Sequence, residues 1–336
     1  MKQAWLANLN PSYFTLTMAT GIVAIALQIH GYQYLSAPLT ALALVSWITL
    51  LALYTWRLIK YPLAVFDNLR TPGTAFSFFS FVAASNVCGL LLHNMGFFKL
   101  ALATWFVSFV YWSTVLYLSF ASLCIGRPGQ LSNIVDGGWL MMIVATQSLV
   151  LLGARVAHTL GAYQNAMMVE ITMLWCLGVL FYGIFVTLFC YRIFFTKTDV
   201  EDFTPLIWVV MGAAAISANA ASSLVLAKPG LATLAELRPV VQMSAILWWT
   251  WASWWIPMLF GIGLWKHGYH QTPLVYTPAL WSMVFPLGMY CVATKKLVLS
   301  AQFTPLLTLS SSVLWIACIA WIFVVTAYLK STYNNL

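Results

Sequence analysis

The chain has 336 residues, of which 62% are hydrophobic and only 7% are charged, whereas about a quarter of the residues in a soluble domain are charged. This small number of polar side chains cannot cover the surface of a water-soluble fold of this size. The composition therefore excludes a soluble enzyme and a disordered chain. The net charge of +8 is not gathered into a Lys/Arg patch that could follow phosphates, and we therefore expect no nucleic-acid partner.

Long apolar runs predict an all-α membrane protein with ten transmembrane helices, since about 20 apolar residues cross the hydrocarbon core of a bilayer. The loops between the runs are short. We therefore expect one transmembrane transport domain over residues 1–336, surrounded by the lipid bilayer, with no catalytic residues and no enzyme activity. The predicted helices are, in chain order, Tyr13–His30, Pro38–Ile59, Thr74–His93, Phe97–Ile125, Gly137–His158, Met168–Phe195, Pro205–Ala227, Val240–Trp265, Pro278–Val298 and Leu306–Lys330.

The distribution of Lys and Arg between the loops predicts the orientation, because positively charged loops stay on the cytoplasmic side. Ten helices place both chain ends on one side of the membrane. Nine of the 15 Lys and Arg residues fall on that side and six on the other. We therefore expect an integral protein of the cell (inner) membrane with both termini in the cytoplasm.

The odd-numbered helices begin in a similar way, with a residue able to cap a helix followed by Pro or Gly. These pairs recur at intervals of about 60 to 75 residues, which fits one helical hairpin per repeat. The repetition predicts five helical hairpins, with the odd-numbered helices as an inner ring around a central pore. The alternative is that Pro marks any helix start, as at Ala37-Pro38 and Thr304-Pro305. The five pairs are Asn10-Pro11, Thr71-Pro72, Asp136-Gly137, Thr204-Pro205 and Thr277-Pro278.

The odd-numbered helices would all end on the outer side, and each of these ends carries basic or imidazole side chains. One interpretation is a cationic outer vestibule that concentrates anions. The alternative is that cations simply favour the C-terminal ends of helices. The residues are His30, His93, Arg155, His158, Lys228, Lys295 and Lys296.

No Asp, Glu, Lys or Arg lies near the centre of a predicted helix, although buried carboxylates are the usual proton relays of coupled transporters. This favours movement of a solute down its own electrochemical gradient. A pore lined by neutral polar groups binds an anion weakly enough to release it, while the alternative role of such groups is to join helices by hydrogen bonds. The pore-lining candidates are Thr15, Thr20, Gly21, Thr146, Gln147 and Asn219.

The ninth predicted helix contains Phe285-Pro286 near its middle. Pro286 removes one backbone donor and its ring clashes with the carbonyl of Ser282, so we expect a kink there. An aromatic side chain at such a kink can project into a pore and close it by steric block. The alternative is that Phe285 is an ordinary packed core residue.

Three segments resemble the bacterial tellurite-resistance/dicarboxylate transporter family, which includes plant slow-type anion channels, fungal malate permeases and sulfite exporters. The segments are NPSYFTLTMATGIVAIAL, WRLIKYPLAVFDNLRTPGTAFSFFSF and PALWSMVFPLGMYCVAT. The resemblance implies ten helices in five hairpins, a pore along the inner ring, a homotrimer with one pore in each subunit, and a pore plug that corresponds to Phe285. Pro286 departs from the family pattern, because some bacterial members have Gly after the aromatic residue.

The favoured function is a channel or facilitator that passes small inorganic or organic anions through a pore within the subunit, gated by Phe285 with Pro286. One alternative is a secondary transporter for C4-dicarboxylates such as malate, linked to protons through His30, His93 or His158, or an exporter of sulfite or tellurite. Another is a haem protein that uses these histidines as axial ligands. The six cysteines contain no C-x-x-C pair, and we expect no metal site and no cofactor.

Overall fold

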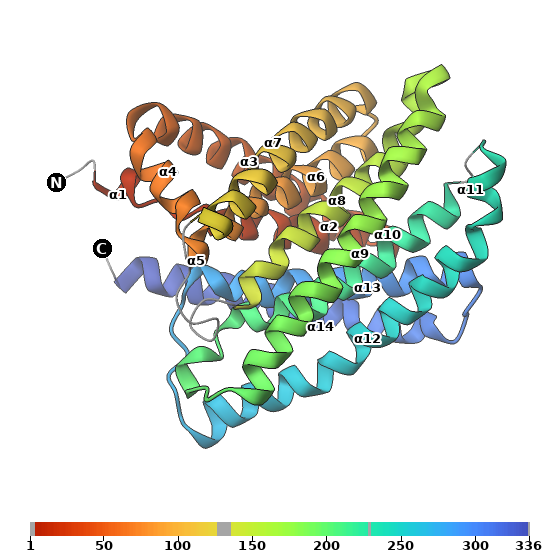
Figure 1. Ribbon diagram of the computed structural model, residues 1–336. Helices are drawn as coiled ribbons and strands as arrows, with labels where there is room; N and C mark the ends of the chain where they lie inside the picture. The colour runs from red at the N-terminus through yellow and green to blue at the C-terminus, as the bar shows by residue number, and fades with distance from the viewer. Residues whose placement is uncertain (1–3, 126–135, 228–229, 335–336) are drawn as a thin grey trace.

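The computed structural model describes residues 4–125, 136–227 and 230–334, and these ranges contain helices and connecting turns but no β-strand (Figure 1). Ten α-helices of at least 16 residues lie within the described ranges. A helix satisfies its backbone hydrogen bonds internally, which is what a chain in hydrocarbon requires. The ten long helices fall into two groups, one buried and one exposed.

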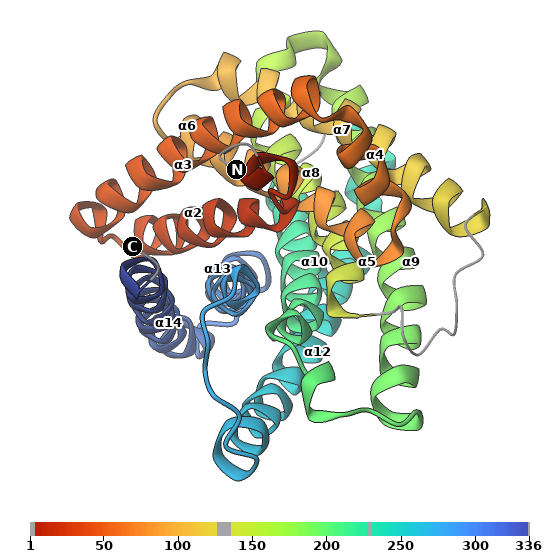
Figure 2. The same cartoon turned by 90° about the vertical axis from the view of Figure 1, so that its left-hand side faces the viewer.

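Five of the long helices form the centre of the molecule, and most of their side chains are buried. They correspond to the odd-numbered helices predicted from the sequence. Each inner helix contacts the next in the order α2, α6, α8, α10 and α13, and α13 also contacts α2. Figure 2 shows α13 nearly end-on between α2 and α10. The inner helices are α2 (Phe14–Ile29), α6 (Phe79–Asn94), α8 (Met141–Val156), α10 (Val209–Leu226) and α13 (Trp281–Ala301).

Each inner helix is paired with a longer helix that follows it in the chain and packs against it. These outer helices have 27 to 32 residues, which makes them about 40 to 48 Å long. Large apolar side chains on them face outward, for example Val45 (61% exposed), Val110 (64%) and Ile319 (66%). The outer helices are α3 (Gln33–Lys60), α7 (Phe98–Ile125), α9 (Gln164–Phe195), α12 (Arg238–Leu264) and α14 (Leu306–Asn334).

Eight segments of the described chain are long and apolar enough to cross a membrane. One of them, Gly137–Phe195, contains both α8 and α9, so the eight segments include nine of the ten long helices and leave out α12. The protein is therefore a helical membrane protein with several apolar helices. Ten crossings stay a prediction.

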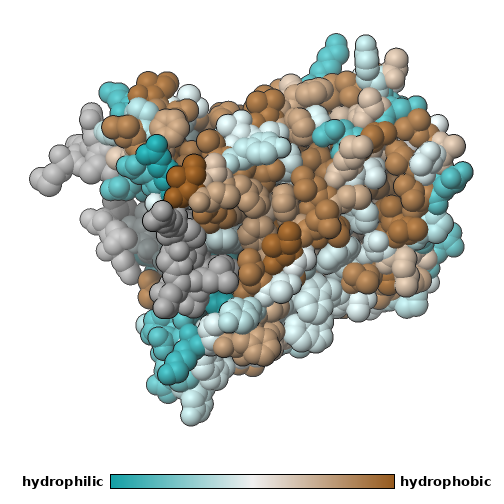
Figure 3. All heavy atoms as spheres, viewed as in Figure 1, coloured by the Kyte–Doolittle hydropathy of each residue, from teal (hydrophilic) through white to brown (hydrophobic). Residues whose placement is uncertain are grey.

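The surface has the pattern expected of a membrane protein. In Figure 3 the middle of the visible face is mostly hydrophobic, and hydrophilic residues gather toward its two ends. Helix α1 (Ala4–Ala7) and the last turns of α14 lie at the same end of the molecule in Figure 1. An apolar belt between two polar ends fits a bilayer, and an arrangement with both chain ends on one side fits an even number of crossings.

A short 3₁₀ turn precedes every inner helix, and these turns contact one another in the same cyclic order as the helices. Four of them begin at a Pro or Gly that the sequence predicted as a helix start, and at Thr71-Pro72 the short helix α5 (Pro72–Ala75) comes first. The turns are η1 (Pro11–Tyr13), η2 (Phe76–Phe78), η4 (Gly137–Leu140), η7 (Pro205–Trp208) and η9 (Pro278–Leu280).

Only two of the five expected capping side chains act as caps. Asn10 Oδ1 accepts a hydrogen bond from the backbone N–H of Ser12 (2.9 Å), and Asp136 Oδ1 accepts one from Gly138 (2.8 Å). The expected caps at Thr71, Thr204 and Thr277 are wrong, because these side chains form no capping hydrogen bond. Pro fixes the first helical turn at these three positions without one.

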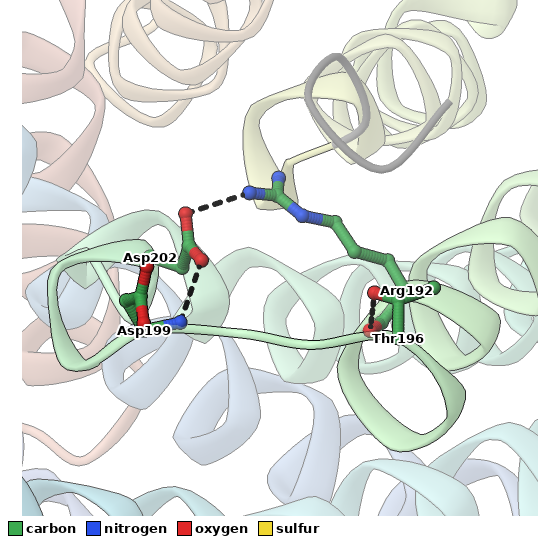
Figure 4. Close-up of polar contacts among 4 residues, drawn as sticks. All are labelled: Arg192, Thr196, Asp199 and Asp202. Atoms are coloured by element: carbon green, nitrogen blue, oxygen red, sulfur yellow. Dashed lines mark hydrogen bonds and ion pairs between the residues drawn. The ribbon is translucent and has the colours of Figure 1, made fainter. Parts of the chain in front are cut away.

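Three short helices were not predicted from the sequence: α1, α4 (Pro62–Arg70), which contacts both α3 and α7, and α11 (Ala232–Glu236). The connection from α9 to η7 is held by polar contacts (Figure 4). Arg192 Nη2 donates to Asp202 Oδ1 (3.0 Å), and Asp202 Oδ2 accepts from the backbone N–H of Asp199 (2.9 Å).

Candidate functional site

The C-terminal halves of the five inner helices enclose a cavity of about 40 Å³, which is room for roughly three water molecules. We call it the five-helix cavity, because every inner helix contributes to its wall. It lies at the end of these helices opposite the 3₁₀ turns. Its lining residues are Ile22, Ile25 and Ile29 of α2, Leu90 and Asn94 of α6, Leu151 and Arg155 of α8, Asn219 and Ser223 of α10, and Val292 and Lys296 of α13.

Two cations face the five-helix cavity, and its lining contains no acidic residue. Arg155 comes from α8 and Lys296 from α13, and they lie close enough for their positive charges to repel each other. Within the described ranges the one ion pair is Arg192–Asp202, far along the chain from both. The cavity therefore has a positive potential, and a small anion between the two cations would relieve their repulsion.

Neutral polar groups complete the wall. Asn219 Nδ2 donates to the Sδ of Met289 (3.3 Å), which is a weak acceptor, and its buried Oδ1 has no partner among the described residues. Asn94 Nδ2 donates to Gln28 Oε1 (2.8 Å) at the cavity's end. The groups that can donate to an anion are the second N–H of Asn219 Nδ2 and the hydroxyl of Ser223, because the unpaired Oδ1 can only accept.

The cavity face of each inner helix continues past the cavity toward the 3₁₀ turns. The residue two turns before a cavity-lining residue lies on the same helix face, about 10 Å away. Seven residues before Ile25, Leu90, Leu151, Asn219 and Val292, each inner helix has a buried residue without a polar side chain, and Phe285 (1% exposed) is the one aromatic among them. We call this set the closing layer: Met18, Ala83, Val144, Gly212 and Phe285. The same step from Ile22 and Arg155 reaches the polar residues Thr15 and Ser148.

Helix α13, which carries Phe285, packs closely against α10 and α2. A Cβ added to Gly212 of α10 would lie 2.8 Å from Pro286 Cγ, and a Cβ added to Gly288 would lie 2.8 Å from Ile22 Cγ2 of α2. α13 continues as one helix through Pro286, which leaves the carbonyl of Ser282 without its usual N–H partner. The buried hydroxyl of Ser282 also lacks a partner among the described residues, so unpaired polar groups lie one turn from the Phe285 ring.

Two of the six pore-lining candidates lie on the cavity face of their helices. Asn219 lines the cavity itself. Thr15 is two turns from Ile22, and its hydroxyl donates to the carbonyl of Ser12 (2.6 Å).

The other four candidates point toward neighbouring helices. Trp321 of α14 donates to Thr20 Oγ1 (3.1 Å), and Trp112 of α7 donates to Thr146 Oγ1 (2.9 Å). Gln147 Nε2 donates to the carbonyl of Trp175 on α9 (3.2 Å). A Cβ added to Gly21 would lie 2.5 Å from Val87 Cγ1 of α6. Their observed contacts are those between helices, which was the alternative interpretation of such groups.

Only some of the predicted outer cations line the cavity. Arg155 and Lys296 line the cavity, whereas Lys295 is not among the lining residues. Lys228 lies outside the described residues.

The histidines are also separated. The rings of His93, in the last turn of α6, and His158, in the 3₁₀ segment Ala157–Tyr163 that follows α8, are 5.6 Å apart between centroids. His30 instead contacts the carbonyl of Ala26 through Nδ1 (2.8 Å) and Ser310 Oγ of α14 through Nε2 (3.1 Å). The structure thus brings together two of the three histidines considered as haem ligands, and both nitrogens of the third are engaged by the protein.

Three polar residues were not among the candidates from the sequence, namely Asn94 and Ser223 in the cavity wall and Ser282 one turn before Phe285. Asn94 and Ser223 follow the cavity residues Leu90 and Asn219 by four positions, which is the spacing of one helix face. This spacing would have found them only once a residue on the cavity face was known.

Comparison with known proteins identifies the family. Residues 8–329 match the family described as the voltage-dependent anion channel, SLAC1. The uncharacterized transporter MJ0762 of Methanocaldococcus jannaschii is 21% identical over 346 aligned positions, covering 99% of this chain and 97% of that protein. The uncharacterized membrane protein MT1776 of Mycobacterium tuberculosis (strain CDC 1551 / Oshkosh) is 36% identical over 121 residues.

The mycobacterial match is partial: it covers 36% of this chain, and this chain spans 60% of the length of that relative. The family match, by contrast, extends over nearly the whole sequence and includes all ten long helices. The chain therefore belongs to the voltage-dependent anion channel family.

Proposed function

We propose that the protein is an anion channel or facilitator whose pathway runs along the axis of α2, α6, α8, α10 and α13. The observation that carries this proposal is the five-helix cavity, whose wall contains two cations and no acidic residue. All ten long helices would cross the cell membrane, with the 3₁₀ turns and both chain ends on the cytoplasmic side. The substrates are small inorganic or organic anions.

The electrostatics of the cavity favour an anion over a cation. Arg155 and Lys296 attract a negative charge, and the polar side chains of Asn219 and Ser223 replace part of its hydration shell. Farther along the axis, the closing layer presents no charge that would hold the anion. An anion is thus concentrated at one end without a deep binding site, which is the condition for rapid conduction.

Phe285 is the proposed gate, and Pro286 positions it. Val292 and Lys296 of the cavity wall follow Phe285 by seven and eleven residues, so the three side chains share one face of α13. Phe285 therefore lies about 16 Å from Lys296 along this face. With the ring buried, the pathway is closed; rotation of the ring away from the axis would open it.

Ion-substituted recordings on the purified protein in planar bilayers test the proposal. With chloride or nitrate gradients and an impermeant cation, we expect a reversal potential that follows the anion gradient. A reversal potential that follows the cation, or wild-type and Phe285→Ala proteins that both pass no ion, would contradict it.

The second candidate function is a proton-linked carrier for C4-dicarboxylates, sulfite or tellurite. The observation in its favour is the contact between His93 and His158 beside the cavity, since imidazoles exchange protons near neutral pH. Uptake of labelled malate or sulfite into proteoliposomes that requires an imposed pH gradient would favour the carrier. Uptake that is unchanged without this gradient would favour the channel.

The proposed assembly is a homotrimer with one pathway in each subunit. Its support is the family resemblance together with the apolar outer surfaces of α3, α7 and α14, which suit either lipid or a second subunit. Mass measurement of the protein in nanodiscs would give three copies if the assembly is correct.

A further inference from the structure

A second large cavity lies on the outer surface, away from the five-helix axis. It has a volume of about 720 Å³ and runs between α3 and α7, with α4 at one end. We call it the α3–α7 groove. Its floor is apolar and buried, as at Phe14 (2% exposed) and Val115 (3%). A cavity of this size accommodates a ligand rather than a few waters.

The rim of the groove is apolar and open to the side. Val107 (61% exposed) and Val110 (64%) form one rim on α7, and Leu51 (39%) lies on α3. Both helices belong to the outer group, so in a membrane the groove faces hydrocarbon. An occupant must therefore be soluble in the lipid phase, at least along most of its length.

One cation lies in the wall of the groove. Arg57 is 1% exposed, and its Nε and Nη2 both donate to the carbonyl of Ala7 (3.2 and 2.9 Å). Its Nη1 is buried and has no hydrogen-bond partner among the described residues, and the groove lining contains no Asp or Glu. A buried guanidinium without a counter-ion is costly. The groove thus presents an unmatched positive charge beside an apolar channel.

The position of the charge fits the depth of a lipid headgroup. Arg57 lies in the last turn of α3, near α1 and the 3₁₀ turns. From that level the groove extends along α7 from Leu118 to Phe106, which is about 18 Å of helix. Half the hydrocarbon core of a bilayer is about 15 Å thick. The groove therefore runs from one membrane surface to about the midplane.

We propose that the α3–α7 groove binds an anionic phospholipid, with the phosphate on Arg57 and one acyl chain lying between α3 and α7. The lipid belongs to the leaflet on the side of the 3₁₀ turns. The guanidinium donates from Nη1 to a phosphate oxygen, an arrangement that pairs the charge and is stronger than a neutral hydrogen bond. This site is independent of the anion pathway and stands whether or not the pathway conducts.

A groove elsewhere on the surface provides a comparison within the same chain. It also measures about 720 Å³ and includes Lys266, from the short π-helix Trp265–Tyr269 that follows α12. The Nζ of Lys266 donates to the carbonyl of Phe203 (3.0 Å), and the side chain is only half-buried, so water can reach its other N–H groups. The second groove therefore lacks the buried, partly unpaired cation that distinguishes the first.

Native mass spectrometry of the full chain in detergent tests the proposal, after titration with phosphatidylglycerol or with phosphatidylcholine of the same acyl chains. We expect wild type to retain phosphatidylglycerol roughly tenfold better, because both lipids carry a phosphate but only phosphatidylglycerol has a net negative charge to offset the buried guanidinium. Arg57→Gln should abolish this preference. Lys60→Gln, which removes an exposed cation at the same depth, should leave it unchanged.

A second variant tests the proposal if the Arg57→Gln protein does not fold. Val110→Trp fills the groove from its exposed rim without touching Arg57, and it should reduce phosphatidylglycerol retention to the level of phosphatidylcholine. Equal retention of the two lipids by wild type, or a preference that survives both variants, would overturn the proposal.

Two further experiments test for other occupants of the α3–α7 groove. If inorganic phosphate raises the melting temperature as much as phosphatidylglycerol vesicles do, the site takes a free anion and the lipid assignment is wrong. If Val110→Cys forms a disulfide between two copies in the membrane, a second subunit covers the groove and the lipid assignment is likewise wrong. Absence of both effects, with the lipid preference present, supports the proposal.

Discussion

At the level of single residues, the proposed anion pathway depends on the two cations of the five-helix cavity, Arg155 and Lys296. Lys296 lines the cavity whereas its neighbour Lys295 does not, because consecutive residues of a helix point about 100° apart. This pair of adjacent lysines therefore provides a variant and a control with the same chemistry.

We predict that Lys296→Gln lowers chloride conductance by about three- to tenfold at low ionic strength, since the remaining field at the cavity is weaker. Lys295→Gln should change it little. Single-channel or flux measurements at low and high salt check the prediction, and the difference should shrink in high salt because the charges are screened. Equal effects of the two substitutions would place the cavity outside the pathway.

Asp136 contributes a pH dependence at the start of α8. The carboxylate caps Gly138 but is partly withdrawn from water, and this burial raises the pKa of Asp136 above its ordinary value, although the backbone N–H groups and Arg192 act in the opposite direction. A carboxyl with a raised pKa in the folded state binds its proton more tightly there than in the unfolded chain. Stability is therefore highest in acid and falls as the pH rises through the folded-state pKa.

Asp136→Asn should remove this loss of stability at higher pH, because an amide oxygen can still cap Gly138 and carries no charge to desolvate. We expect the variant to be at least as stable as wild type at pH 7 and to lack the decline in melting temperature that begins in wild type above about pH 4, the ordinary pKa of an Asp carboxyl. Thermal unfolding followed by tryptophan fluorescence measures both. Identical pH profiles of the two proteins would exclude Asp136 as the titrating group.

Which polar residues face the pathway could be predicted only in part. Asn219 and Thr15 lie on the cavity face, but Thr20, Thr146 and Gln147 bond to outer helices. The reason is physical: an inner helix is buried on all sides, so it has no polar stripe that marks one face. The signal that separates the axis from the outer helices is the identity of the partner, such as a Trp N–H, and this depends on the fold.

At the scale of elements, the fit of α13 against α10 determines where the Phe285 ring lies. Gly212 leaves room for the Pro286 ring, so a substitution at Gly212 acts on the gate through the helix backbone. Neither residue needs to contact the anion for this effect.

Gly212→Ala should push α13 away from α10, since the new methyl group would meet the rigid Pro286 ring at 2.8 Å. We expect destabilisation by about 1 to 3 kcal/mol and a raised basal conductance. Gly261→Ala is the control, because nothing lies within 4 Å of its added Cβ, and Ala is the better helix former. A stable Gly212→Ala protein with wild-type conductance would show that this contact does not hold the gate.

The starts of the inner helices were predictable because Pro and Gly mark them in the sequence. The predicted capping role held for Asn10 and Asp136 but failed at three threonines. Threonine can donate its hydroxyl elsewhere, as Thr71 does to the carbonyl of Asp67 (2.9 Å), and the sequence alone does not reveal this competition.

Asn10→Ala should therefore cost about 1 kcal/mol of stability through the lost cap. Thr277→Ala should cost less than about 0.5 kcal/mol, because the exposed Thr277 side chain makes no capping bond. Melting temperatures of the two variants under one detergent condition compare them directly. A larger loss for Thr277→Ala would contradict the assignment of the caps.

For the whole molecule, composition was enough to predict a helical membrane protein. The Pro and Gly pairs predicted five transmembrane hairpins around a central pore; consecutive long helices do pack against each other, while the ten crossings and the pore stay predictions. Helices α4 and α11 were missed because they have nine and five residues, too few for an apolar period to be recognised. The α3–α7 groove was also beyond the sequence, since it depends on the distance between two helices that are remote in the chain.

The central claim is that anions move along the five-helix axis and that Phe285 closes it. Conductance of Phe285→Ala in planar bilayers tests it most directly, with Phe189→Ala as a control that removes an equally buried ring (2% exposed) from the outer helix α9. We expect Phe285→Ala to raise anion conductance about tenfold or more, which corresponds to a barrier lower by about 1.4 kcal/mol, and Phe189→Ala to leave it unchanged. Wild-type conductance in a correctly folded Phe285→Ala protein would contradict it.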